Sequence, residues 1–266
     1  MRIVLPSQGI LGVREVDLQM PKYRHVRDIS QMNYSEEEIG FRFVEMLVSS
    51  NDIFDKITYQ DKDYLLAIAV SALHLNALKL AVTCTCGERV TTMLDMSDVD
   101  VIDLDVNTPK EVRKKFGDTE YSYRFLSAND ENEVVLWAKD KSDGDPLKYQ
   151  RLYEEGFVCK TFGFDLNDEN LKKVSNYDLM IYYSALLFRE MVFHGISPIK
   201  SEICPKCGRK IGVIIPFAKS LMSWNSSRVV NEFMAVAGIV GGFDSFLDLT
   251  FSELAQMKAN QSILQE

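Results

Sequence analysis

Cys84-Thr85-Cys86-Gly87 and Cys204-Pro205-Lys206-Cys207-Gly208 are the two stretches of sequence that decide how this chain folds. Each pair of cysteines is followed by glycine, the residue that most easily adopts the left-handed backbone of a tight turn. Two such knuckles supply the four sulfurs of a closed tetrahedral zinc site. Because residues 87–203 separate the pairs, a shared metal joins two distant halves of the chain. The sequence therefore predicts a structural Zn²⁺ bound by Cys84, Cys86, Cys204 and Cys207.

Other interpretations of the two pairs stay open on the sequence alone. Cys-Pro-X-Cys-Gly, at Cys204, is a frequent zinc-ribbon knuckle, whereas the Cys-X-Cys spacing at Cys84 is less common and is a weaker signal. One alternative is that the two cysteine pairs are structural and bind no metal. A redox pair like that of thioredoxin is another, but a strand-like run over 211–215 follows the second knuckle, where a thiol-activating helix would be needed.

The remaining cysteine and the histidines are weaker candidates. Cys159 stands alone between aromatic residues, and we expect it to be a small core residue. His25, His74 and His194 are each an alternative fourth ligand if the first pair binds incompletely, and His194 lies nearest to a knuckle in sequence. Histidines in such positions are more often structural residues or cations at helix C-termini.

Composition indicates a folded, soluble protein. The 266 residues are 46% hydrophobic and 11% aromatic, enough for a substantial core and too apolar for a disordered chain. The opening residues Met1 to Pro6 lack the apolar segment of a signal peptide. The longest apolar stretch, Phe233 to Phe243, is far shorter than the roughly 20 residues that span a bilayer. We expect a reducing compartment, where paired cysteines favour metal over disulfides.

The charge of the chain favours protein partners over nucleic acid. Lys and Arg number 30 against 39 Asp and Glu, a net charge of -9, whereas binding to nucleic acid depends on neutralising phosphates. Acidic residues from Asp95 to Asp105 follow the first knuckle, and only three cations cluster at the second (Lys206, Arg209 and Lys210). We therefore expect no nucleic acid and no membrane among the partners.

The periodicity of the apolar residues predicts an α+β fold, mostly helical, with small antiparallel hairpins that carry a split zinc-ribbon-like site. Ser35 and Glu38 form a capping box at one helix start. Other helices are expected over 63–77, 131–139, 147–155, 176–192 (capped by Ser175 or Asn176) and from 226, with strands over 80–83, 89–94 and 121–126. We divide the chain into residues 1–105 with the first knuckle, a middle insertion 106–165, and a helical region 166–266 with the second knuckle.

Signatures of catalysis are missing from the sequence. It contains no phosphate-binding loop, no nucleophile elbow and no His-Glu-X2-His motif. A metal held by four sulfurs has no open position for water. We predict that the protein is not an enzyme, and an enzyme with a metal-stapled lid is the third choice of function.

The order of the motifs resembles the baseplate hub assembly proteins of T-even-type phages. The resemblance is carried by Leu5-Pro6-Ser7-X-Gly9, by Asp61-Lys-Asp-Tyr-Leu-Leu66 before a buried helix, and by the knuckles, and it covers about residues 1–105 and 200–215. It implies a structural or assembly protein of a contractile tail baseplate hub, whose partners are other phage baseplate and tail proteins. The implied location is the host cytoplasm during assembly and the virion tail baseplate.

Two contact surfaces and one rival function accompany this interpretation. The segment around Leu5 to Gly9 and the stretch Phe233 to Phe251 are the candidate contact surfaces, although the aromatics of the second can also complete the chain's own core. The rival function is a zinc-ribbon accessory factor that binds nucleic acid. The net charge of -9 disfavours that alternative.

Overall fold

The computed structural model describes residues 1–32, 35–73, 77–95, 99–197, 199–215, 217–222, 226–237, 240 and 242–263. Helices dominate these residues, and the strands form two-stranded antiparallel sheets. The predicted α+β class, mostly helical with small hairpins, is confirmed. No helix within these ranges combines the length and the apolar character needed to cross a bilayer.

The bounds of the elements are as follows. The helices are α1 (Tyr23–Ser30), α2 (Glu36–Leu47), the 3-10 helix η1 (Asn51–Asp55), α3 (Tyr59–Leu73), α4 (Ala128–Ser142), α5 (Pro146–Thr161), α6 (Asp168–Ser175), α7 (Leu179–Met191), α8 (Phe217–Met222), α9 (Ser226–Met234), α10 (Phe243–Leu247) and α11 (Phe251–Ile263). The paired strands are β1 (Arg2–Val4) with β2 (Glu15–Asp17), β3 (Ala77–Thr83) with β4 (Arg89–Asp95), β5 (Val101–Ile102) with β8 (Gly195–Ile196), β6 (Glu111–Phe116) with β7 (Thr119–Arg124), and β9 (Ile199–Ile203) with β10 (Lys210–Ile214).

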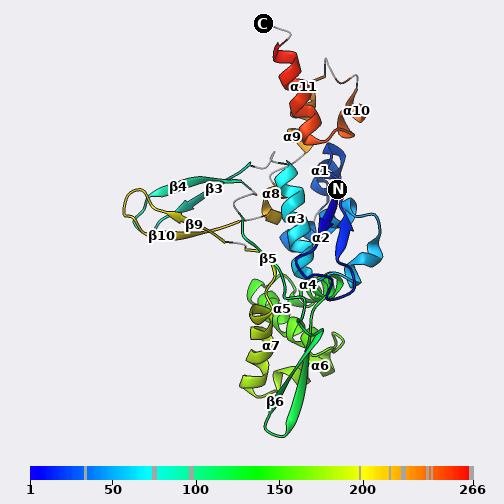
Figure 1. Cartoon of the computed structure of the whole chain (residues 1–266), viewed down its shortest axis with the longest axis vertical. Helices are drawn as coiled ribbons and strands as arrows, with labels where there is room; N and C mark the ends of the chain where they lie inside the picture. Colours follow the sequence, from blue (N-terminus) through cyan, green and yellow to red (C-terminus); the bar gives the residue numbers. More distant parts are fainter. Residues whose placement is uncertain are drawn as a thin grey trace.

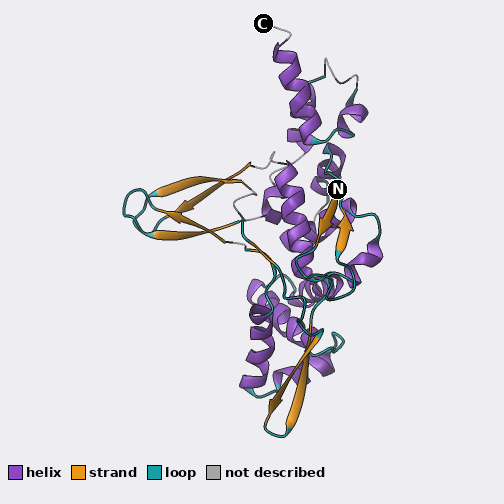
Figure 2. Cartoon of the chain, in the orientation of Figure 1, coloured by secondary structure: helices purple, strands orange, loops and turns teal. Residues whose placement is uncertain are grey.

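Three parts extend from a helical centre formed by α1, α2 and α3 (Figures 1 and 2). The hairpins β3–β4 and β9–β10 form an arm on one side, α5 to α7 lie below with the β6–β7 hairpin, and α9 to α11 lie above. Strands β5 and β8 pair at the base of the arm, with Val101 opposite Ile196. This pair ties the segment that leaves the first hairpin to the segment that enters the second.

The main core lies in the helical centre. Ser35 accepts the backbone N–H of Glu38 at the start of α2, and the Glu38 carboxylate accepts that of Ser35, so the predicted capping box is confirmed. Helix α3 is apolar on most of its surface and is largely buried. Fully buried side chains of this core include Phe43, Phe54, Leu65 and Phe246.

A second core lies below the centre, between the β6–β7 hairpin and α5, α6 and α7. Tyr123, Val158, Cys159 and Phe188 are buried there. The Tyr123 hydroxyl lies 2.6 Å from Ser184 Oγ, which satisfies the one polar atom of an otherwise apolar ring. Helix α7 therefore packs one of its faces against this hairpin.

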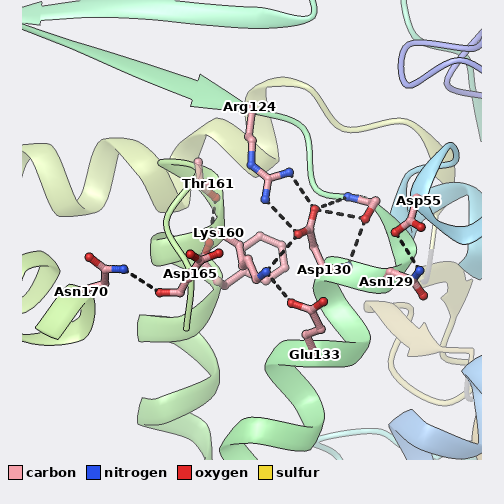
Figure 3. A network of polar contacts seen from close by, with 11 residues as sticks. Asp55, Arg124, Asn129, Asp130, Glu133, Lys160, Thr161, Asp165 and Asn170 are labelled. Atoms are coloured by element: carbon pink, nitrogen blue, oxygen red, sulfur yellow. Dashed lines mark hydrogen bonds and ion pairs between the residues drawn. The ribbon is translucent and has the colours of Figure 1, made fainter. Parts of the chain in front are cut away.

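A polar network at the start of α4 joins β7, α4 and α5 (Figure 3). The guanidinium of Arg124 donates to both oxygens of Asp130, at 2.8 and 2.9 Å, and the backbone N–H of Ser127 donates to the same carboxylate at 3.0 Å. Lys160 lies 3.4 Å from Asp130 and 2.5 Å from Glu133. The Asp130 carboxylate thus caps α4 and also binds side chains of β7 and α5.

Several predicted boundaries are wrong. The helix expected over 63–77 begins at Tyr59, since Asp61 accepts the backbone N–H of Thr58 and the Thr58 hydroxyl accepts that of Asp61, which caps the helix four residues earlier. The helix expected over 176–192 is α7, which begins three residues later at Leu179, because Asp178 and not Ser175 or Asn176 caps it, and a separate helix, α6, ends at Ser175. The strand expected over 121–126 is β7, the second strand of the β6–β7 hairpin, and it begins and ends two residues earlier than expected.

The N-terminal segment is buried and not exposed. Leu5 and Ser7 are buried, the backbone N–H of Ser7 donates to Asp61 Oδ1 at 3.0 Å, and the N–H of Leu104 donates to the carbonyl of Pro6 at 2.8 Å. The candidate contact surface at Leu5 to Gly9 is therefore internal for most of its length.

Candidate metal centre

The first knuckle closes the β3–β4 hairpin. Thr83 pairs with Arg89 at the end of the ladder, and the backbone N–H of Cys84 then donates to the carbonyl of Glu88 at 2.8 Å. Gly87 donates to the carbonyl of Cys84 at 2.8 Å and has a φ of +86°. A Cβ at Gly87 would meet nothing within 4 Å, so the turn requires glycine for its backbone conformation and not for space.

The second knuckle repeats this design at the end of β9–β10. Ile203 pairs with Lys210, and the backbone N–H of Cys204 donates to the carbonyl of Arg209 at 2.9 Å. Gly208 has a φ of +69° and donates to the carbonyl of Cys204 at 2.9 Å. Both knuckles therefore form from local backbone hydrogen bonds, which is why the sequence predicts them.

The two knuckles bring all four predicted sulfurs together. Cys84 Sγ lies 3.7 Å from Cys207 Sγ, and Cys86 Sγ lies 3.7 Å from Cys204 Sγ. All four sulfurs lie within 4.8 Å of one another. A tetrahedral ion with bonds of about 2.3 Å to sulfur places its sulfurs about 3.8 Å apart. The separations fit a four-sulfur metal site.

The site has a buried side and an exposed side. Cys84 and Cys204 are 3% and 1% exposed, whereas Cys86 and Cys207 are exposed. The two buried cysteines pack with Val90, and Val82 and Ile211 lie against them. This small apolar cluster packs the two hairpins together on the buried side of the four sulfurs.

Polar contacts also hold the two hairpins together. The Thr92 hydroxyl donates to Glu202 at 2.7 Å, and Lys200 donates to the carbonyl of Met93 at 3.1 Å. Nearer the tip, Arg209 donates to the hydroxyl of Thr85. These contacts are not predictable from the sequence, because polar residues in strands give no signal of which strand lies opposite.

The thiols of the site influence one another. Chiefly through the backbone N–H of Cys86, and with help from neighbouring thiols, the pKa of Cys84 is lowered to about 6. At Cys86 the backbone N–H of Glu88 favours the thiolate, but partial desolvation and the adjoining thiols outweigh it and raise the pKa to about 12. A second thiolate beside the first is thus unfavourable without a cation, and a divalent metal bound there would supply that cation.

The donor set fits a structural metal. Four thiolates in a tetrahedron suit zinc and also iron, and they leave no coordination position for water. Bound zinc would supply charge neutralisation and a rigid link between the hairpins, with Cys84, Cys86, Cys204 and Cys207 as its holders.

The other candidate ligands lie elsewhere in the molecule. Cys159 is buried in the second core, and burial raises its pKa to about 12. His194 is buried, with Nε2 2.7 Å from Thr58 Oγ1 and Nδ1 2.9 Å from the carbonyl of Val192, and burial lowers its pKa. His25 Nδ1 accepts the backbone N–H of Lys22 at the start of α1. His74 lies outside the described residues.

Comparison with protein-family models, with curated proteins and with solved structures finds no match for this chain.

Proposed function

We propose that the chain binds one zinc ion through its four knuckle cysteines and that this ion is structural. The observation that carries the proposal is the set of four sulfurs, drawn from two hairpins far apart in sequence and lying within 4.8 Å of one another. Zinc there stiffens the arm, because it links the tips of two hairpins that otherwise share a small apolar cluster and a few polar contacts.

We further propose that the protein is a structural or assembly component of a contractile phage tail baseplate hub, and that it acts through protein–protein contacts and not as an enzyme. The motif order supports this proposal. The segments quoted for the resemblance also contact each other, since Ser7 donates to Asp61. Its partners are then other baseplate and tail proteins, first in the host cytoplasm and then in the tail baseplate.

Elemental analysis tests the metal. Protein purified under reducing conditions without added metal should contain about one equivalent of zinc per chain, and Cys204→Ser should lose it. Cys159→Ser is the matched control and should retain the ion, because Cys159 lies in a different core. Folded, reduced protein with less than about a tenth of an equivalent of any metal would contradict the proposal.

A second experiment tests the role in assembly. Tagged protein recovered from infected host cells should bring down baseplate proteins identified by mass spectrometry, and deletion of its gene should block hub formation. Normal tails assembled without the protein would overturn this role. Tight binding to DNA with a steep loss of affinity as salt rises would instead favour the rival accessory factor.

A further inference from the structure

Helix α7 has two apolar faces, and only one of them lies in the second core. Ile181, Ala185 and Phe188 face inward and are buried. The opposite face exposes a stripe of large apolar side chains. The outer stripe comprises Leu179 (69% exposed), Met180 (69%), Tyr183 (51%), Leu187 (56%) and Met191 (64%).

The outer stripe follows the geometry of a helix–helix contact. Met180, Tyr183, Leu187 and Met191 recur at spacings of three, four and four residues, which places them along one side of the helix. In Figure 1, α7 lies on the outer side of the lower part of the molecule, and the exposed fractions of its outer side chains leave the stripe open to a partner. An exposed row of large apolar side chains is typical of a protein interface.

We propose that the outer stripe is the interface with a second copy of this chain, with the two α7 helices packed antiparallel. The stripe is nearly the same when read in either direction, with Leu179 and Met180 at one end, Met191 at the other, and Tyr183 and Leu187 between them. A twofold axis that crosses the outer face of α7 at the level of residue 185 places Tyr183 opposite Leu187 of the second copy, and Leu179 opposite Met191. Such self-complementarity is what an isologous interface requires.

The charges at the two ends of the stripe fit the same arrangement. Asp178 caps the N-terminus of α7, and the ammonium of Lys114 lies 3.4 Å from Met191 Sδ at the C-terminus. Antiparallel packing brings Lys114 of each copy toward Asp178 of the other. It also sets the two helix dipoles in opposition, which is favourable. Parallel packing would place like charges together at each end.

The size of the stripe indicates a weak dimer. Five side chains on one helix of 13 residues cover less than the roughly 800 Å² per partner of a standard stable interface. We therefore expect monomers and dimers in exchange at micromolar concentrations or above. This dimer is independent of the metal site, because the arm and α7 lie on separate parts of the molecule.

Sedimentation of the full-length, zinc-loaded protein tests the interface. The wild-type protein should shift from monomer to dimer as its concentration rises, and Leu187→Lys or Met180→Lys should weaken the dimer by about tenfold or more. Met93→Lys is the matched control, because Met93 is a similarly exposed apolar residue (54%) on β4 of the arm. A wild-type protein that stays monomeric at all concentrations would overturn the proposal, and so would equal effects of Leu187→Lys and Met93→Lys.

Cysteine crosslinking tests the antiparallel arrangement. A mixture of Tyr183→Cys and Leu187→Cys proteins should form a disulfide-linked dimer on mild oxidation, above the background of the wild-type protein with its own exposed Cys86 and Cys207. Leu187→Cys alone should crosslink less than the mixture. Stronger crosslinking of Leu187→Cys alone would place position 187 opposite itself and overturn the antiparallel dimer.

Discussion

Asp130 shows how one side chain can organise three elements. It caps α4 through the N–H of Ser127, forms a two-pronged pair with Arg124 on β7, and lies 3.4 Å from Lys160 on α5 (Figure 3). Asp130→Asn removes the charge and leaves the two cations with weaker partners. We expect a loss of about 2 kcal/mol in the free energy of unfolding, measured by urea denaturation at pH 7. Asp165→Asn is the control, because the nearby, exposed Asp165 takes part in Figure 3 through its backbone carbonyl, which accepts from Asn170, and not through its carboxylate.

The contribution of Asp130 should also be visible in how the free energy of unfolding depends on pH. Burial alone would raise the pKa of Asp130, but Arg124, the Ser127 N–H and Lys160 outweigh it and hold the pKa below its usual value. A carboxyl with a lowered pKa in the folded state contributes stability above its unfolded pKa of about 4, and this contribution is lost as the pH falls through the folded pKa.

Asp130→Asn should therefore flatten the dependence of the free energy of unfolding on pH below about pH 4. A residual slope should persist in this variant, because the pKa of Glu38 is lowered as well: burial would raise it, but Lys139 and Ser35 outweigh that effect. Identical pH profiles for the wild-type protein and Asp130→Asn would contradict the assignment.

Substitutions at Cys207 and at its neighbour Lys206 distinguish the effect of losing the metal from the effect of changing the turn. Both side chains are exposed in the second knuckle. Cys207→Ser should lose zinc and lower the melting temperature, whereas Lys206→Ser should change neither, because only the thiolate is a ligand. Equal melting temperatures for the two variants in zinc-replete buffer would mean that no metal joins the hairpins.

At the scale of elements, the arm should depend on zinc more than the helices do. Its strands pack against a small apolar cluster, whereas α2 and α3 are buried in the main core. Removal of zinc by a chelator should therefore speed amide hydrogen exchange in β3, β4, β9 and β10 by about tenfold or more. Exchange in α2 and α3 should stay unchanged. Slowed or uniform exchange across the molecule would contradict a zinc-dependent arm.

What the sequence predicts correctly is local. Each knuckle forms from contacts within a few residues of its glycine, and the box at Ser35 and Glu38 spans one helical turn. The one long-range feature that the sequence predicts is the convergence of the four cysteines, because a structural zinc site takes four ligands. The start of α7 is not predicted, because Ser175, Asn176 and Asp178 are all good caps and packing selects among them. The pairing of Arg124, Asp130 and Lys160 depends on how β7, α4 and α5 meet.

At the scale of the whole molecule, the C-terminal tail belongs to the main core. Tyr23 of α1 stacks on Phe251 with ring centroids 4.0 Å apart and contacts Phe246 at 4.4 Å. Leu247 and Leu254 are buried beside them. Phe246 and Phe251, which belong to the candidate contact stretch Phe233 to Phe251, therefore pack in the chain's own core. The outer stripe of α7 is the more exposed apolar surface.

Removal of the tail should therefore unfold the centre and not merely delete an interface. A chain ending at residue 225 should be insoluble or should melt at a much lower temperature, because Tyr23 and the core beneath it become exposed. A gentler test is Phe246→Ala, which should cost about 3–5 kcal/mol in the free energy of unfolding, as expected for a buried phenylalanine. Met234→Ala, at a 67% exposed position of the same tail, should cost little. A truncated protein that is soluble, cooperatively folded and loaded with metal would show that the centre is stable alone and that the tail serves partners instead.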